Sequence, residues 1–259
     1  MLFLLSPAKT LDYDTPVPAP VRKKATEPLF SARAAELIAV LRKKSPAQIA
    51  ALMELSAPLA ELNAARYLAW QLQADAANSK PALLAFDGDV YGGLDARSLK
   101  TADLSWAQDH LLILSGLYGA LRPLDRLQPY RLEMGRALKT SQGRDLYAYW
   151  GDTVAGLINQ HQAQEPAPVV VNLASLEYSR VALRKSLRAR VIDCVFEDWK
   201  DSRYKVISFF AKRARGLMAR HAIDKRARRP AQLESFAVEG YAFDAGSSGP
   251  DRLVFRRRL

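Results

Sequence analysis

The chain has 259 residues, of which 49% are hydrophobic and 25% are charged, and its formal net charge is +11. The apolar fraction is ample for a core, but no run approaches the 18 or so apolar residues that a membrane-spanning helix needs. The positive charge favours an anionic partner, either nucleic acid or a phosphorylated small molecule.

The first half of the chain alternates between apolar runs and helical periodicity. Ser31 and Ser45 are candidate helix caps, and Pro46 suits a first helical turn. The predicted elements are strands at 2–5 and 81–86, an extended proline-rich segment at 16–20, and helices at 31–44, 45–55, 59–70 and 98–109.

The second half predicts strands at 110–114, 168–173, 191–196, 204–209 and 253–255, and helices at 145–160 and 211–221. A polar turn at 198–202 makes two of these strands neighbours. Strands and helices alternate without a regular period, a repeat or a flexible linker. We therefore expect one mixed α/β domain over 1–259, with a mixed sheet flanked by helices and a helical hairpin inserted at about 30–75.

The positive charge is concentrated in one part of the sequence. The segment 180–229 holds sixteen Lys and Arg but five Asp and Glu, a surplus equal to the net charge of the whole chain. The remainder is therefore about neutral. We expect this segment to favour phosphate, although any single cation in it can equally be a solvated side chain on a helix face.

One cysteine, Cys194, lies in the apolar run Val191–Phe196. A lone cysteine cannot form an internal disulfide, which fits a reducing cytoplasm, and its neighbours predict a buried thiol. A redox sensor would need an accessible thiol of low pKa. The start of the chain, Met1–Leu5, is too short and not basic enough for a secretory signal. We expect a cytoplasmic protein.

Polar turns follow several of the predicted strands. They are Ser6–Lys9, Asp87–Asp89, Ser115–Tyr118 and Asn172–Ser175. Strand ends that meet at one edge of an open α/β sheet form a ligand crevice. The predicted lining is Ser6, Lys9, Asp89, Tyr118, Asn172 and Ser175. The alternative is a set of separate surface turns.

The loop Ser115–Gly135 combines glycine, proline, tyrosine and arginine, and its glycines allow a sharp turn or a close approach. It adds Glu133 to the cleft lining. Arginine suits phosphate because its planar fork donates two hydrogen bonds at once. The candidate phosphate-binding residues are Lys9, Arg122, Arg131, Lys212 and Arg215. The last two share a helix face, and the adjacent Gly216 would let another backbone come close.

Five segments in this order resemble the signature of the YaaA family of bacterial peroxide stress proteins: Leu5–Tyr13, Ala85–Tyr91, Ser115–Gly135, Asn172–Tyr178 and Ser208–Met218. The resemblance covers essentially the whole chain. It implies a cytosolic protein with a mixed α/β fold peculiar to the family, a positively charged cleft, a helix-hairpin-helix element, DNA binding and a role in surviving hydrogen peroxide. It implies no settled catalytic activity.

The segment 47–70 matches a helix-hairpin-helix only in part, because Leu55–Leu59 replaces the usual glycine-containing turn. The alternative is an ordinary helical hairpin packed through leucines. The histidines at 110, 161 and 221 have no metal-ligand spacing, and the common metal and nucleotide fingerprints are absent from the sequence. We expect no metal and no cofactor.

Two functions remain in view. The first is a DNA-binding protein that contacts backbone phosphates, with little sequence preference, and protects DNA during peroxide stress. The second is an enzyme acting on a nucleotide or another phosphorylated small molecule in the same crevice. Its proton-transfer groups would be Lys9 or Tyr118, its carboxylate Asp89 or Glu133, and its phosphate clamps Arg122 and Arg131.

Overall fold

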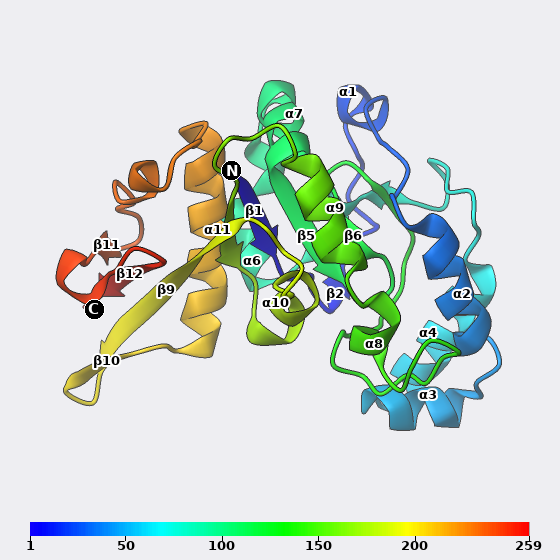
Figure 1. Ribbon diagram of the computed structural model, residues 1–259. Helices are drawn as coiled ribbons and strands as arrows, with labels where there is room; N and C mark the ends of the chain where they lie inside the picture. Colours follow the sequence, from blue (N-terminus) through cyan, green and yellow to red (C-terminus); the bar gives the residue numbers. More distant parts are fainter. Residues whose placement is uncertain (259) are drawn as a thin grey trace.

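The computed structural model describes residues 1–258, and its centre is an eight-stranded sheet (Figure 1). The strands are β1 (Leu2–Leu5), β5 (Leu111–Ser115), β6 (Gly119–Leu121), β8 (Val169–Leu173), β9 (Arg190–Lys200), β10 (Arg203–Lys205), β11 (Ala242–Phe243) and β12 (Arg252–Arg257). Their order is β11-β12-β9-β8-β1-β5-β6, with β10 paired to β9. The sheet is mixed, because β6, β10 and β11 run antiparallel to their neighbours and the other pairs are parallel. The predicted mixed α/β class is confirmed.

The strand β1 lies in the middle of this sheet, and all four of its side chains are buried. Its last residue, Leu5, pairs with Ile113 of β5 on one side and with Leu173 of β8 on the other. The carboxyl ends of three parallel strands therefore meet at one edge, where the polar turns after β1 and β8 begin.

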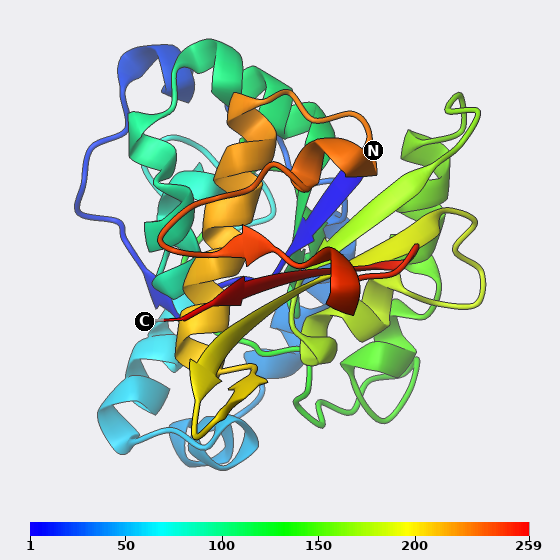
Figure 2. The same ribbon diagram turned by 90° about the vertical axis from the view of Figure 1, so that its left-hand side faces the viewer.

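Helices cover both faces of the sheet, as the two views show (Figures 1 and 2). One layer contains α6 (Asp89–Leu94), α7 (Thr101–His110) and α11 (Ser208–Asp224). The other contains α8 (Leu146–Trp150), α9 (Thr153–His161) and α10 (Leu176–Ala182). Three more helices, α2 (Ser31–Leu41), α3 (Pro46–Met53) and α4 (Ala57–Ala69), lie beyond the β6 edge in Figure 1.

The smaller elements join these layers. Two short antiparallel pairs form between distant segments, β2 (Thr10–Leu11) with β4 (Phe86–Asp87), and β3 (Lys80–Pro81) with β7 (Arg126–Leu127). The remaining elements are the single helical turns α1 (Ala19–Arg22) and α5 (Ala82–Ala85) and three 3-10 turns at 96–98, 230–233 and 245–247.

The capping of α3 follows from its sequence. The Ser45 hydroxyl accepts from the Gln48 backbone N–H at 3.3 Å, and the Gln48 side chain accepts from the Ser45 N–H at 2.9 Å. This reciprocal pair satisfies two backbone N–H donors at the helix start, where Pro46 has no backbone N–H. The predicted cap at Ser45 is confirmed. The predicted cap at Ser31 is wrong, because its hydroxyl instead donates to the Pro28 carbonyl at 2.9 Å.

Two glycines let α6 and α11 cross in direct backbone contact. A Cβ on Gly216 would lie 1.8 Å from the Val90 carbonyl oxygen, and one on Gly93 would lie 2.3 Å from the Arg213 carbonyl oxygen. No side chain larger than hydrogen fits at either position. The close approach expected at Gly216 is therefore confirmed, with α6 as the partner.

Four predicted elements differ in the structure. The segment 16–20, expected to be extended, enters the helical turn α1 at Ala19, because Pro20 suits a first helical turn. Residues 81–86 form the helical turn α5 between two short strands, since Ala and Leu favour helix and a short apolar run has no distinctive period. The expected helix 145–160 is divided into α8 and α9 at Gly151, whose φ is +48°. The strand expected at 204–209 ends at Lys205, and α11 begins at Ser208.

Cys194 is buried in β9, where it pairs with Leu253 of β12. Burial raises the pKa of its thiol, so little reactive thiolate forms at neutral pH. We expect the native protein not to react with an aromatic disulfide reagent, and the unfolded chain to titrate one thiol. Rapid labelling before unfolding would contradict this burial.

Candidate functional site

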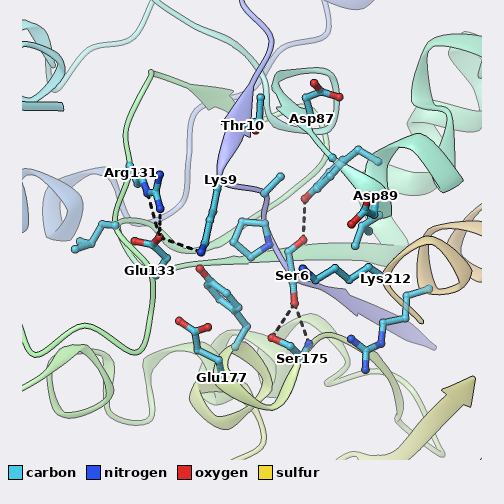
Figure 3. A pocket seen from close by; sticks show the side chains of 18 of the residues that line it. Ser6, Lys9, Thr10, Asp87, Asp89, Arg131, Glu133, Ser175, Glu177 and Lys212 are labelled. Carbon is cyan, nitrogen blue, oxygen red and sulfur yellow. Dashed lines mark hydrogen bonds and ion pairs between the residues drawn. The ribbon is translucent and has the colours of Figure 1, made fainter. Parts of the chain in front are cut away.

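An open cavity of about 490 Å³ lies at the edge where β1 and β8 end (Figure 3). Five segments that are distant in the sequence line it: the turn after β1, the start of α6, the loop 130–133, the start of α10 and the first half of α11. Eight of the residues predicted for the site line this cavity: Ser6, Lys9, Asp89, Arg131, Glu133, Ser175, Lys212 and Arg215.

Ser6 and Ser175 join the two strand ends at the cavity floor. The Ser6 hydroxyl accepts from the Ser175 backbone N–H at 2.8 Å, and the two hydroxyl oxygens are 3.3 Å apart. The Ser6 carbonyl accepts from the Tyr91 hydroxyl at 3.0 Å. These bonds fix the turn after β1 against both α10 and α6.

One flank of the cavity is a cluster of charges around Glu133. Its Oε1 lies 3.1 Å from Arg131 Nε, 3.0 Å from Arg131 Nη2 and 4.0 Å from Lys9 Nζ. The Glu133 side chain is only 8% exposed, whereas that of Lys9 is 66% exposed. Tyr67 of α4 donates to the Arg131 carbonyl and holds this loop from behind. Arg131 is therefore positioned, and Lys9 is free to extend toward a ligand.

The opposite flank carries cations without carboxylate partners. Lys212 and Arg215 lie three residues apart in α11, and neither forms a salt bridge or a side-chain hydrogen bond with any residue from 1 to 258. Lys212 is exposed, whereas Arg215 is half-buried, and burial lowers the pKa of its guanidinium. A guanidinium stays charged in proteins. Arg215 forms no ion pair within 4 Å, and only the more distant Asp193 carboxylate offsets part of its charge.

Acidic side chains also line the cavity. Asp87 and Glu177 are exposed at its edge, and Asp89 stands near Lys212 in Figure 3. With Glu133 these make four carboxylates against four cations. The cavity is therefore polar and mixed in sign, with its unpaired positive charge on the α11 side.

Three residues expected in the crevice lie elsewhere. Tyr118 is buried and accepts from Trp70 Nε1 at 2.8 Å. Asn172 donates to Asp193 Oδ1 at 2.8 Å, because its position in β8 turns it toward the neighbouring strand. Arg122 donates through Nε and Nη2 to the buried Asp125 Oδ1 at 3.0 and 2.8 Å, and its side chain does not line the cavity.

Several lining residues were missed by the sequence interpretation, above all the tyrosines at 91, 130 and 178. Burial raises the pKa of all three phenols, so they remain neutral and act as hydrogen-bonding walls. The family resemblance could have indicated some of the lining residues, because its segments contain Asp87, Tyr91, Glu177 and Tyr178.

Much of the charge surplus in 180–229 is compensated from outside that segment. Five arginines of the segment form ion pairs with carboxylates outside it. The pairs are Arg184 with Asp152, Arg190 with Asp251, Arg213 with Glu239, Arg220 with Asp95, and Arg226 with Asp103. The basic window of the sequence is thus not one continuous basic surface. Lys212 and Arg215 stand out because they are unpaired and line a cavity.

Within residues 1–258 the structure contains no group of three His, Cys, Asp or Glu side chains arranged to hold a metal ion. Over the same residues, no helix has the length and apolar character required to cross a bilayer.

The sequence profile of the family described as peroxide stress protein YaaA matches residues 1–247. The chain belongs to the YaaA family. It is 66% identical to a UPF0246 protein of Leptothrix cholodnii over 99% of this chain and 98% of the relative. It is 60% identical to one of Verminephrobacter eiseniae, over 100% of this chain and 98% of that protein. It is 58% identical to UPF0246 protein BAV2675 of Bordetella avium, over the full length of both. The resemblance noted in the sequence is confirmed.

Proposed function

We propose that this YaaA protein binds DNA in the peroxide stress response, with backbone phosphates held at the cavity by Lys9, Arg131, Lys212 and Arg215. The observation that carries the proposal is Arg215. A half-buried guanidinium that no carboxylate contacts directly, with only the more distant Asp193 charge to offset it, is stabilised by a bound anion, and phosphate matches its planar fork.

The proposed binding mode is contact with the backbone and not with base edges. The chain has a net charge of +11, and the cationic residues of the cavity come from two loops and from the side of helix α11. Such contacts position a protein on DNA without reading sequence. In the family's peroxide stress role, a protein bound in this way would shield DNA from oxidative damage.

The hairpin of α3 and α4 contributes less to this proposal. Between residues 46 and 69 the charged side chains are Glu54, Glu61 and Arg66, so the hairpin has no positive surplus of its own. Glu54, at the turn, pairs with Arg136 at 3.0 Å. We therefore assign the phosphate contacts to α11 and the cavity loops, and not to a helix-hairpin-helix element.

A second function is favoured by the shape of the site. A volume of about 490 Å³ is that of a small-ligand pocket and admits a single nucleotide unit. The buried cluster of Arg131 and Glu133 is also more elaborate than backbone binding requires. The alternative is thus an enzyme that acts on a nucleotide or another phosphorylated small molecule here.

The salt dependence of binding tests the DNA proposal. We expect the affinity for a short duplex to fall with salt at a log–log slope of about −0.9 per phosphate contact. Replacing both Lys212 and Arg215 with Ala should flatten that slope by about two units, because two contacts are lost. The matched control is Lys185→Ala with Arg188→Ala, two exposed, unpaired cations before the amino end of β9. If the two double variants had equal slopes of affinity against salt, Lys212 and Arg215 would not be phosphate contacts.

A thermal-shift panel separates the two functions. If DNA is the ligand, short duplexes should raise the melting temperature and mononucleotides should do little. A large shift from a single nucleotide, lost in Arg131→Ala, would instead establish the small-molecule site, because that change removes a charge-assisted clamp.

A further inference from the structure

The outer end of β9 projects beyond the sheet as part of a hairpin (Figures 1 and 2). Residues 190–193 pair with β8 and residues 193–198 with β12, whereas 198–200 pair with β10. We call residues 199–206 the arm. Its two strands are joined by Asp201 and Ser202, which both have positive φ, +52° and +60°. Such a two-residue turn matches the twist of a hairpin and leaves the arm short and well defined.

The base of the arm is anchored in the core. Asp198 accepts from Arg257 Nε at 2.6 Å and from the Tyr241 hydroxyl at 2.7 Å, and these side chains are buried. The Arg257 guanidinium also lies over the Phe210 ring at 4.7 Å. The arm is thus attached to β12 and to the first turn of α11, so its position is fixed relative to the cavity.

The arm presents cations beside aromatic rings. Lys200 and Arg203 pair across the two strands, are exposed, and form no salt bridge with residues 1–258. Trp199 and Tyr204 pack edge to face with ring centroids 4.9 Å apart. Arg258 lies over the Trp199 ring at 4.7 Å and adds a third exposed cation. Unpaired cations interleaved with aromatic rings are typical of a surface that follows a nucleic-acid backbone.

The arm leads toward the cavity along α11. Val206, the last residue of the arm, and Phe209, in the first turn of α11, are 52% and 59% exposed, although both are large and apolar. Phe209 and Lys212 are three residues apart and so lie on the same side of the helix. Exposed cations and an exposed aromatic ring therefore follow one another along the chain, from Lys200 and Arg203, through Phe209, to Lys212.

We propose that the arm is a second contact for the same DNA molecule, with Lys200 and Arg203 on phosphates, the half-buried Trp199 ring close to the strand, and the exposed Phe209 ring against its sugar face. This inference rests on the proposed DNA binding. A ligand that extends beyond the cavity explains why unpaired cations stand on the arm, where a mononucleotide bound in the cavity would not reach them. A duplex is a suitable partner because each of its strands presents one phosphate for every 3.4 Å or so of helix axis.

The test compares three double variants on one duplex: Lys200→Ala with Arg203→Ala, the cavity pair Lys212→Ala with Arg215→Ala, and the control pair Lys185→Ala with Arg188→Ala. Each removes two positive charges. We expect the arm and cavity variants each to flatten the salt slope by about two units, and the control to change it by much less. Thermal melting verifies that each variant is folded.

The outcomes separate the two proposals. A cavity variant that loses slope while the arm variant matches the control would overturn the arm and leave the cavity assignment intact. Absence of duplex binding by the parent protein at low salt would overturn both. A further measurement leaves every cation in place. Duplex binding should alter the Trp199 fluorescence, and this response should be lost in the Trp199→Phe variant. An unchanged signal from Trp199 in the saturated complex would also count against the arm.

Discussion

Gly216→Ala should unfold this protein or destabilise it by about 3 kcal/mol or more. A Cβ at this position would stand 1.8 Å from the Val90 carbonyl oxygen, which is backbone and cannot move aside as a flexible side chain could. The two helices would have to separate, and with them the cavity residues Asp89 and Lys212. Urea unfolding followed by circular dichroism measures the loss.

The matched control for this substitution is Gly156, an exposed glycine within α9 that has no atom within 4 Å of an added Cβ. Gly156→Ala should be neutral or stabilising by about 0.5–1 kcal/mol, because alanine favours helix over glycine. If Gly216→Ala and Gly156→Ala had the same unfolding free energy, the close crossing of α6 and α11 would be refuted.

Asp198→Asn should cost about 3–5 kcal/mol of unfolding free energy, because it leaves the Arg257 charge buried without a counter-charge. The two side chains are 4% and 7% exposed. The double variant Asp198→Leu with Arg257→Met should recover much of that loss, since apolar replacement removes both buried charges. A double-mutant cycle in urea measures the coupling.

The control for the buried pair is Asp251→Asn, which breaks an ion pair with Arg190 whose side chains are 64% and 50% exposed. Solvent screens such a pair, so its loss should cost less than about 1 kcal/mol. If the Asp198 and Asp251 variants lost similar stability, burial would not be what makes the Asp198 pair important.

Strong local signals predicted most of the fold correctly. The apolar run of β1, the capping residues of α3 and the β-branched run of β8 each determine their element locally. The strand expected at 81–86 failed because Ala82–Ala85 is apolar without a period, and only its tertiary neighbours decide its conformation. The break at Gly151 was missed because it depends on one positive φ within a helical pattern.

Eight of the predicted site residues line the cavity, and the physical reason is clearest where the sheet topology brings two of them together. Ser6 and Ser175 follow neighbouring parallel strands, so their meeting follows from the sheet. Tyr118 and Arg122 lie in an equally suggestive loop, but the fold gives them the partners Trp70 and Asp125 instead. A sequence shows which residues are able to bind phosphate, whereas the pairing of each charge requires coordinates. For the same reason the basic window 180–229 overstated the positive surface.

The central place of β1 has a consequence for how the chain reaches its native state. Leu2–Leu5 cannot complete its backbone pairing until residues 111–115 and 169–173 are available. The sheet therefore requires contacts that close loops of roughly a hundred residues or more, a topology that folds slowly. A chain interrupted before residue 169 would leave an apolar parallel strand with an open edge, which is prone to aggregate. Assembly of the cavity is thus a late step, and its ligand would report on completion of the whole fold.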